Sequence, residues 1–550
     1  MFYAPPTMFD AIVSPPRPTN ETVLSYAPGS PERATLKAEL ARQSGKTVEI
    51  PMFIDGKEIT TGVLQDVRSP HRHDLLLGRA HQGTEEHVAQ AIAASRKAHA
   101  SWSSLPWTAR AGVFLKAAEL LSTRYRPVLN AATMLGQSKT AFQAEIDSAC
   151  ELIDFFRFNV HFASLIAGEQ PQSSPGMWNL LEPRPLEGFV FASTPFNFTA
   201  IAGNLPAAPA IMGNTVVWKP AANALLSAHY VMSLLREAGL PDGVINLVMG
   251  DPPRIANACL DHEDLGGVHF TGSTAVFSAM WRRVGENIVK YRMYPRLVGE
   301  TGGKDFVFAH PSADLDALAV ALVRGAFEYQ GQKCSAASRA YIPRSIWPAL
   351  KQRMIDLIAT LRVGDVSDFR NFMGAVIDGR AHARIKEYIA GARQDAACRI
   401  LAGGDTPDKD GWFVHPTLIE TTDPKHRLMR EEIFGPVLTC WVFPDEEEER
   451  ALELCDTTTP YALTGAIFGT DRGFIERALR SLRFAAGNVY INDKPTGAVV
   501  GQQPFGGARS SGTNDKAGSP LNLYRWVSPR AIKETFVPPR AVGYPSLEAE

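Results

Sequence analysis

Short apolar runs alternate with segments of helical periodicity through most of this 550-residue chain, and this alternation limits the fold more than any other feature. Between residues 188 and 270, four runs rich in β-branched and aromatic residues recur at intervals of roughly 25–30 residues. Strand–helix–strand repeats of this kind favour right-handed crossovers and a parallel sheet. A second series follows between residues 305 and 490, so the sequence predicts an α/β protein with two open parallel-sheet domains. The eight runs are Gly188–Ala192, Thr215–Trp218, Val244–Val248, Gly267–Phe270, Asp305–Phe308, Ala340–Ile342, Val437–Val442 and Gly487–Tyr490.

Polar residues follow the expected strands of the first series. Asn197 comes after the first strand, Lys219 after the second, and Gly272 with Ser273 after the fourth. Ligands of open parallel sheets bind at the carboxyl ends of the strands. A Gly and a Ser that open a helix there can offer backbone N–H groups and a hydroxyl to a diphosphate. The alternative is that Gly272 and Ser273 form only a tight turn with an N-cap.

Two further segments carry the residue types that acyl chemistry requires. Gln330–Ser335 places Cys334 among small and polar residues, and Gly299–Lys304 offers Glu300 followed by two glycines. A thiol nucleophile and a separate carboxylate base can make and then hydrolyse a covalent acyl intermediate. We expect Lys333 to favour the thiolate of its neighbour, Cys334. The alternative is that Cys334, one of six cysteines, is a buried small hydrophobe.

Composition excludes several classes of function. The chain is 45% hydrophobic and 21% charged with a net charge of −2, so neither nucleic acid nor an anionic membrane is an expected partner. No apolar run reaches the roughly eighteen residues of a membrane span. The chain has no CxxC or HExxH motif, and we expect no metal site and a solvated loop at 71–73. Residues 1–16 lack Lys and Arg and resemble no targeting segment, so a cytoplasmic location is expected, or the mitochondrial matrix in a eukaryote.

Together these segments resemble the NAD(P)-dependent aldehyde dehydrogenase superfamily, over about residues 50–540. Within it the chain is similar to the Δ1-pyrroline-5-carboxylate dehydrogenase branch, also called L-glutamate γ-semialdehyde dehydrogenase. The motifs that carry the superfamily match are Pro195–Phe198, Trp218–Pro220, Phe270–Ser273, Gly299–Lys304, Gln330–Ser335 and Glu431–Pro436. The narrower match rests on Tyr26–Arg33, Asn197–Ile201, Thr301, Phe277, Phe327–Ser335 and Thr496–Lys516.

The resemblance implies an oxidation of L-glutamate γ-semialdehyde to L-glutamate with reduction of NAD, the second step of proline degradation. Cys334 would attack the aldehyde, the Asn197 amide and the Cys334 N–H would hold the oxyanion, and Glu300 would activate water. The cofactor-binding residues implied are Thr194, Lys219, Gly272, Ser273, Thr274, Glu432 and Phe434. Ala222 stands where many NAD-preferring relatives have a glutamate that repels a 2′-phosphate, so use of NADP is not excluded.

The resemblance also implies how the substrate would be chosen. The backbone N–H groups of Gly497 and Ala498, with the Ser335 hydroxyl, would hold the substrate carboxylate. Phe198 and Phe505 would enclose the methylene chain, although ordinary core packing is the alternative for both rings. Another NAD(P)-dependent semialdehyde dehydrogenase would share the catalytic residues but not this loop or Ser335. A non-catalytic relative would have lost Cys334, Glu300 or Asn197.

The implied domain organisation is that of aldehyde dehydrogenases, with two Rossmann-like domains and a β-flap for oligomerisation. We expect a homodimer or higher oligomer, because a lone ribbon of two or three strands is barely stable and exposes its edges. Functional coupling with proline dehydrogenase is a further expectation. The expected divisions are an NAD-binding domain with an N-terminal extension at 1–167 and 187–298, a catalytic domain at 299–515, and a flap with a C-terminal tail at 168–186 and 516–550.

Overall fold

The first of the two large sheets is mainly parallel and is built from the first half of the chain. The computed structural model describes residues 13–550, so most of the segment behind the targeting expectation, residues 1–12, lies outside the described residues. Strands β7 and β8 are buried along their whole length, as the continuous apolar runs of a sheet covered on both faces should be. The strand order is β11 (Arg296–Glu300), β10 (Leu265–Thr271), β7 (Phe189–Ser193), β8 (Thr215–Lys219), β9 (Ile245–Leu247), β2 (Met52–Ile54) and β3 (Lys57–Ile59).

The chain reverses its direction of travel across this sheet at β7. Strands β8 and β9 are added on one side of β7, whereas β10 and β11 are added on the other, and all five are parallel. A reversal of this kind opens a crevice beyond the carboxyl ends of the central strands. The parallel-sheet prediction is confirmed, while the antiparallel edge strands β2 and β3 lie outside the eight apolar runs on which it was based.

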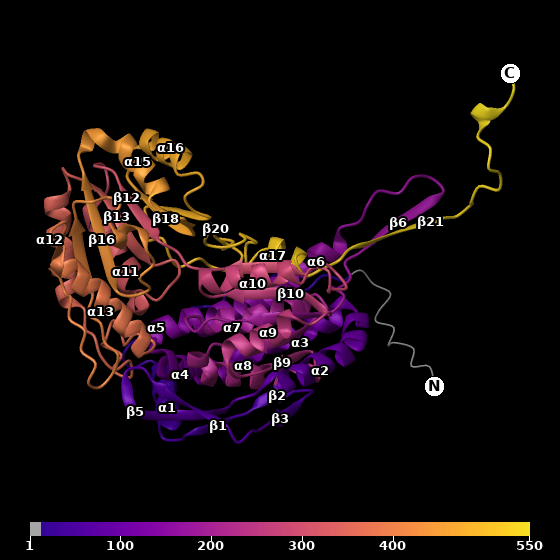
Figure 1. Cartoon of the computed structure of the whole chain (residues 1–550), viewed down its shortest axis with the longest axis horizontal. Helices are drawn as coiled ribbons and strands as arrows, with labels where there is room; N and C mark the ends of the chain where they lie inside the picture. Colours follow the sequence, from indigo (N-terminus) through magenta and orange to yellow (C-terminus); the bar gives the residue numbers. More distant parts are fainter. Residues whose placement is uncertain (1–12) are drawn as a thin grey trace.

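The second sheet stands above the first as a separate lobe (Figure 1). It is parallel except for its edge strand β14, which pairs antiparallel with β15. Its strand order is β14 (Cys398–Ala402), β15 (Thr417–Thr421), β16 (Val437–Phe443), β13 (Ala337–Pro343), β12 (Asp305–Ala309), β18 (Thr464–Phe468) and β19 (Asn488–Ile491). The remaining short strands form the sheet β1 (Val48–Ile50), β5 (Arg72–His81), β4 (Leu64–Ser69) and the pair β17 (Tyr461–Ala462), β20 (Ala508–Arg509).

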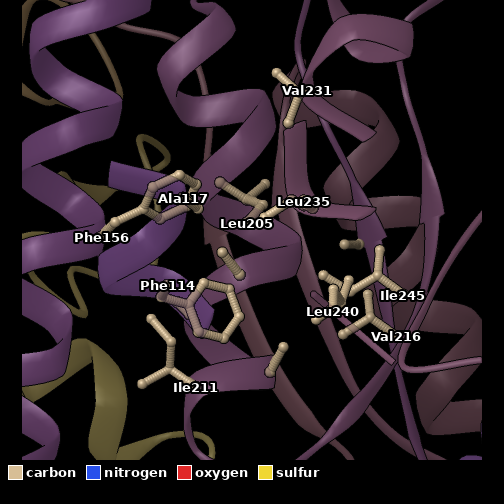
Figure 2. Close-up of a cluster of buried hydrophobic side chains, with 14 of the residues drawn as sticks. Phe114, Ala117, Phe156, Leu205, Ile211, Val216, Val231, Leu235, Leu240 and Ile245 are labelled. Atoms are coloured by element: carbon tan, nitrogen blue, oxygen red, sulfur yellow. The ribbon is translucent and has the colours of Figure 1, made fainter. Parts of the chain in front are cut away.

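Helices cover both sheets, and their packing builds the largest core. Figure 2 shows Phe114 and Phe156 facing the helices and strands of the first domain, with ring centroids 5.9 Å apart. Among residues 13–550, none of the helices is long and apolar enough to cross a membrane. The helices are α1 (Pro31–Ser44), α2 (Glu85–Ser104), α3 (Trp107–Leu120), α4 (Arg126–Gln137), α5 (Ala141–Ala144), α6 (Glu151–Gly168), α7 (Thr199–Ile211), α8 (Leu225–Ala238), α9 (Pro252–Leu260), α10 (Thr274–Glu286), α11 (Leu315–Phe327), α12 (Trp347–Thr360), α13 (Gly379–Gln394), α14 (Arg427–Arg430), α15 (Glu448–Thr457), α16 (Arg472–Ser481) and α17 (Pro520–Tyr524).

A segment from the far end of the chain completes this first core. Trp526, two residues beyond α17, is fully buried against the ring of His269 on β10, with centroids 4.7 Å apart. The Asn214 amide donates a hydrogen bond of 2.8 Å to the Trp526 carbonyl. The core of the first domain therefore includes residues that follow the whole second domain in sequence.

A two-stranded ribbon projects away from both domains (Figure 1). Strand β6 (Met177–Glu182) pairs antiparallel with β21 (Arg530–Thr535) over six residues on each side. Trp178 and Ile532, which lie on these strands, are exposed. The ribbon thus presents apolar side chains to the surroundings, while Gln170 and Ser173 bond the backbone of Leu181 and Asn179 along the outer edge of β6.

Candidate active site

The carboxyl ends of four neighbouring strands carry polar residues. Asn197 follows β7, Lys219 ends β8, Ser273 follows β10, and Glu300 ends β11. Since these strands are parallel neighbours, the four residues lie along one edge of the first sheet. The second domain supplies residues from the opposite side, because Cys334 and Glu432 both precede strands of the second sheet.

One cavity of about 810 Å³ lies between these two sets of residues. A volume of that size is typical of ligand sites. It is lined by eight of the residues expected from the sequence, namely Thr194, Asn197, Lys219, Gly272, Ser273, Cys334, Glu432 and Phe434. Thr274 is not among the lining residues, and its hydroxyl donates to Thr301 Oγ1 at 3.1 Å and lies 3.2 Å from the Ser510 carbonyl.

The sheet side of the cavity suits a dinucleotide. Ser273 caps α10, its hydroxyl accepting the Val276 N–H at 3.4 Å, and the free N–H groups of a helix N-terminus bind phosphate. Lys219 is buried, and burial lowers the pKa of its ammonium to about 8 despite the opposing effect of Asp251. The Glu432 carboxylate accepts the Gly303 N–H at 3.0 Å, which fixes it at the cavity wall. These donors and acceptors fit the phosphates and ribose hydroxyls of a nicotinamide dinucleotide.

The loop that carries Cys334 has a left-handed backbone. Tyr329, Gln330 and Gly331 have φ values of 51°, 55° and 64° in succession. Such conformations cost free energy for residues other than glycine and persist only where surrounding contacts impose them. A Cβ on Gly331 would lie 2.2 Å from the Gly435 carbonyl oxygen, so this third position requires glycine.

Three hydrogen bonds to the Gln330 side chain hold this turn. Its amide nitrogen donates to the carbonyls of Ser138 at 3.0 Å and Ala375 at 2.6 Å, and its amide oxygen accepts the Gly374 N–H at 3.1 Å. All of these groups are buried, where an unpaired polar group costs about 1–3 kcal/mol. The turn is therefore fixed from two sides, by the end of α4 and by the segment before α13.

Asn197 connects the same loop to the first sheet. Its amide nitrogen donates to the Gln332 carbonyl at 3.0 Å, two residues before Cys334. A side-chain amide has two N–H groups, and this bond orients the amide. Among residues 13–550 no group accepts the second N–H, which is left for a ligand. Asn197 and Cys334 line the same cavity, so an oxyanion formed on a thiol-bound carbon would lie near that N–H.

Glu300 does not line this cavity, but its carboxylate is near enough to affect the pKa of the Cys334 thiol. Its carboxylate accepts the Gly507 N–H at 2.9 Å. Burial raises the pKa of Glu300 well above its usual value, and the Gly507 N–H and the Lys516 ammonium oppose that rise. A carboxyl group with a raised pKa is a stronger base when ionised, which suits the activation of water.

Comparison with known proteins agrees with this geometry. The model of the aldehyde dehydrogenase family matches residues 58–531. The chain is 51% identical to the mitochondrial Delta-1-pyrroline-5-carboxylate dehydrogenase of Dictyostelium discoideum, over 97% of this chain and 96% of that protein. The chain belongs to the aldehyde dehydrogenase family.

Solved structures support the narrower resemblance. The Delta-pyrroline-5-carboxylate dehydrogenase of Mycobacterium tuberculosis, in a structure bound with NAD, superposes with a TM-score of 0.95 at 53% identity, covering 98% of this chain and all of that one. Proline utilization A of Bdellovibrio bacteriovorus superposes with a TM-score of 0.90 at 30% identity, covering 95% of this chain and 54% of that one. This aldehyde dehydrogenase therefore falls in the Δ1-pyrroline-5-carboxylate dehydrogenase branch, as its motifs predicted.

The residues expected to select the substrate lie outside the lining of the 810 Å³ cavity. Ser335 is buried, with its hydroxyl 2.8 Å from that of Thr496. Gly497 has a φ of 99°, a backbone angle that residues with a side chain rarely adopt. The Phe198 ring lies 4.2 Å from the Lys139 ammonium, and Phe505 pairs through its backbone with Ala517. The remaining expected residue, Ala498, follows Gly497 in the same loop.

The expectation that Lys333 favours the Cys334 thiolate is wrong for this aldehyde dehydrogenase. The Lys333 ammonium lies 3.7 Å from Glu328 and 3.8 Å from Asp147, and both carboxylates are buried with it. Burial, followed by the nearby carboxylates of Asp305, Glu432 and Glu300, raises the pKa of the Cys334 thiol. Adjacency in sequence gave no information about which charged groups the Lys333 side chain contacts.

The prediction of a solvated loop at 71–73 is also wrong. His71 is only 2% exposed, and its ring lies 3.0 Å from the Ser138 hydroxyl and 3.4 Å from Asp365. Burial lowers the pKa of this histidine to about 4. The Ser138 hydroxyl in turn accepts the Ala375 N–H at 2.8 Å, so His71 supports the same segments that hold Gln330.

We predict that Gln330→Ala lowers kcat by roughly 10–100-fold without unfolding the protein, because the Cys334 loop loses the bonds that impose its left-handed turn. Alkylation of Cys334 by iodoacetamide should slow as well, with circular dichroism as the check on folding. Gln352→Ala is the matched control, since Gln352 is an exposed glutamine on α12. A folded Gln330→Ala protein with the wild-type kcat would contradict this role.

Proposed function

We propose that this aldehyde dehydrogenase oxidises L-glutamate γ-semialdehyde, the open form of Δ1-pyrroline-5-carboxylate, to L-glutamate with NAD as the oxidant. The observation that supports this most is the shared cavity, which joins a thiol and an amide donor to the cofactor-binding residues implied by the family. The names of the relatives supply the substrate. The reaction is the second step of proline degradation.

The first chemical step is attack by Cys334. The thiolate adds to the aldehyde carbon, and the carbonyl oxygen becomes an oxyanion held by the free Asn197 N–H and the Cys334 backbone N–H. A preorganised donor of this kind contributes roughly 10²–10³ in rate. The thiolate is the reactive form, so the Cys334 thiol must lose its proton before attack, although burial and the nearby carboxylates raise its pKa.

The second chemical step is oxidation of the aldehyde carbon, for which the cofactor-binding residues would place NAD. NAD, when bound, accepts the hydride that leaves the aldehyde carbon, and a thioester on Cys334 remains. Lys219 and Glu432 would hold the riboses, Phe434 would pack near the nicotinamide, and Thr194 with Gly272 and Ser273 would lie along the remaining cofactor wall. Ala222 offers no carboxylate against a 2′-phosphate, so NADP should be measured beside NAD.

Hydrolysis of the thioester is assigned to Glu300. Its ionised carboxylate removes a proton from water, which attacks the acyl carbon and releases the Cys334 thiolate. Only the ionised form can do this, and the raised pKa moves ionisation to a higher pH than for an ordinary carboxyl group. The rate of hydrolysis should therefore fall as the pH is lowered, and the fall should begin at a higher pH than for an ordinary carboxyl group.

We predict that Cys334→Ala abolishes NADH formation, whereas Glu300→Gln forms NADH once and then stops at the thioester. The neutral amide cannot accept the proton from water, so the acylated chain should be visible by mass spectrometry. In the wild type, hydrolysis measured by rapid quench should slow as the pH falls. Steady turnover by Cys334→Ala would refute the assignment of the nucleophile.

The substrate carboxylate is assigned to the loop that begins at Thr496. The freedom of Gly497 at positive φ lets consecutive N–H groups converge on an anion, with Ser335 alongside. Phe198 and Phe505 would enclose the methylene chain between this anchor and Cys334. Another semialdehyde dehydrogenase remains the second candidate, and the length and charge of the preferred aldehyde decide between them.

We predict that Gly497→Val lowers kcat/KM for glutamate γ-semialdehyde at least tenfold more than for hexanal. A β-branched residue cannot hold the φ of 99°, so the donors should turn away from the carboxylate. Unpaired donors cost about 1–3 kcal/mol each, so wild-type discrimination on the order of 10²–10⁴ is expected. Equal losses for both aldehydes, or a wild-type preference for hexanal, would contradict the anchor.

The ribbon of β6 and β21 is proposed to bind a second copy of the chain. It exposes Trp178 and Ile532, and a cavity of about 1200 Å³ lies at its base, with Ile532 in the wall. An isolated two-stranded ribbon is marginal in water, so contact with a second copy would bury its apolar side chains and protect the edge of β21.

We predict that light scattering gives at least twice the 60.0 kDa chain mass at micromolar protein. Ile532→Asp should shift the population towards the monomer, because the charge would be buried at the interface. Val542→Asp is the control, since Val542 is 98% exposed and lies beyond the ribbon. A wild-type monomer would disprove the dimer.

Two features of the cellular setting belong to the same proposal. The six cysteines are all free, which favours a reducing compartment, either the cytoplasm or the mitochondrial matrix. The similarity to a proline utilization A chain supports functional coupling with a proline dehydrogenase that supplies the substrate.

A further inference from the structure

The loop of residues 496–503 is held by a few contacts gathered around Val499 to Gln503, whereas Gly497 and Ala498 precede them. Within the loop, the Val499 carbonyl accepts the N–H groups of Gln502 and Gln503 at 3.0 Å, and the Gln503 side chain accepts the Val499 N–H at 2.9 Å. Outside it, the Gly518 carbonyl accepts the Gly501 N–H at 3.3 Å. Gly501 packs on the Phe158 ring of α6, where a Cβ would lie 2.2 Å from a ring carbon. The centre of the loop, at Val500, is buried but belongs to no helix or strand.

Asn20, which is 480 positions away from Val500 in sequence, connects this loop to α6. Its amide nitrogen donates to the Val500 carbonyl at 2.8 Å and to the Asp154 carboxylate at 2.8 Å. Its amide oxygen accepts from the Gln502 side chain at 2.8 Å. Both N–H groups and the carbonyl of Asn20 are therefore used, two of the three on the loop itself.

The segment that carries Asn20 is firmly attached to the first domain. The Glu21 N–H donates to the second Asp154 oxygen at 2.7 Å, and the Glu21 carboxylate binds Arg126 at 2.7 Å. Further along, the Leu24 N–H and the Tyr26 hydroxyl both donate to Glu145, at 2.9 and 2.7 Å. Asn20 thus stands on a rigid support, which is what a residue needs in order to fix something else.

We propose that Asn20 is a positioning residue for recognition of the substrate carboxylate. It holds Val500, and through it Gly497 and Ala498, at a fixed distance from α6; this inference rests on the proposed function of that loop. Donors that bind an anion must be placed within about 0.5 Å, and a displacement of about 1 Å can cost roughly 100-fold. Asn20 touches neither the substrate nor the cysteine, so its effect should be confined to aldehydes that carry the carboxylate.

A purely structural role predicts a different result. If Asn20 served only to attach the N-terminal arm, residues 20–26, its loss would resemble the loss of any other arm contact. Tyr26→Phe provides that comparison, because it removes the hydrogen bonds of the Tyr26 hydroxyl with Glu145 and Asn130 and leaves every loop contact in place. The two variants therefore separate attachment of the arm from placement of the loop.

The test measures kcat and KM of Asn20→Ala and Tyr26→Phe with glutamate γ-semialdehyde and with hexanal. We expect Asn20→Ala to lower kcat/KM for the semialdehyde about 10–100-fold, mainly through KM, and to change the value for hexanal less than about threefold. Tyr26→Phe should change neither substrate's kcat/KM by more than about threefold. Retained KM for the semialdehyde in Asn20→Ala would overturn the inference, as would equal losses for both substrates.

Failure of the inference differs from failure of the proposed function. If the wild type shows no preference for the semialdehyde over hexanal, the anchor itself is wrong. If the wild type has the preference and Asn20→Ala keeps it, only the role of Asn20 is wrong. Should Asn20→Ala not fold, Asn20→Asp replaces it, because aspartate has the same shape and keeps the acceptor for Gln502 but loses both donors. Parallel losses for both substrates in Asn20→Asp would likewise overturn the inference.

Discussion

The left-handed turn at Tyr329–Gly331 is the constraint on which the active site depends. Two non-glycine residues in that conformation cost on the order of 1–3 kcal/mol each, so the turn exists only because its surroundings impose it. The Gln330 side-chain amide holds the turn through three buried hydrogen bonds. Asn197 then fixes the loop again at Gln332. Cys334 is consequently held by parts of both domains before any ligand binds.

The two sheets contribute to the site through opposite edges. In the first sheet the functional residues follow the strands, as Asn197 follows β7 and Ser273 follows β10. In the second sheet they come before them, since Cys334 precedes β13 and Glu432 precedes β16. A dinucleotide bound to the carboxyl edge of one sheet therefore faces a nucleophile presented at the amino edge of the other.

The sequence was informative where a residue's role depends on its place relative to a strand. The apolar runs predicted β7, β8 and β10, and the polar residues after them line one cavity, because parallel strands share a carboxyl edge. Prediction failed where side-chain direction matters. Lys333 is next to Cys334 in sequence but pairs with Asp147 and Glu328, and His71 is buried rather than solvated. The supporting roles of Gln330 and Asn20 were not predicted, since their partners are hydrogen-bonding groups from distant segments and no local pattern indicates those contacts.

Trp526 has a consequence for how the protein is made. All strands of the first sheet are present once residue 300 has been synthesised. Trp526, which completes the core that packs on them, is more than 200 residues further along the chain. At 5–20 residues per second, a ribosome takes roughly 10–45 s to cover that interval. During this time the surface that Trp526 will cover on β10 faces water or a chaperone. The second domain can complete its own sheet in the interval, so the domain that comes first in the chain is the last to finish folding.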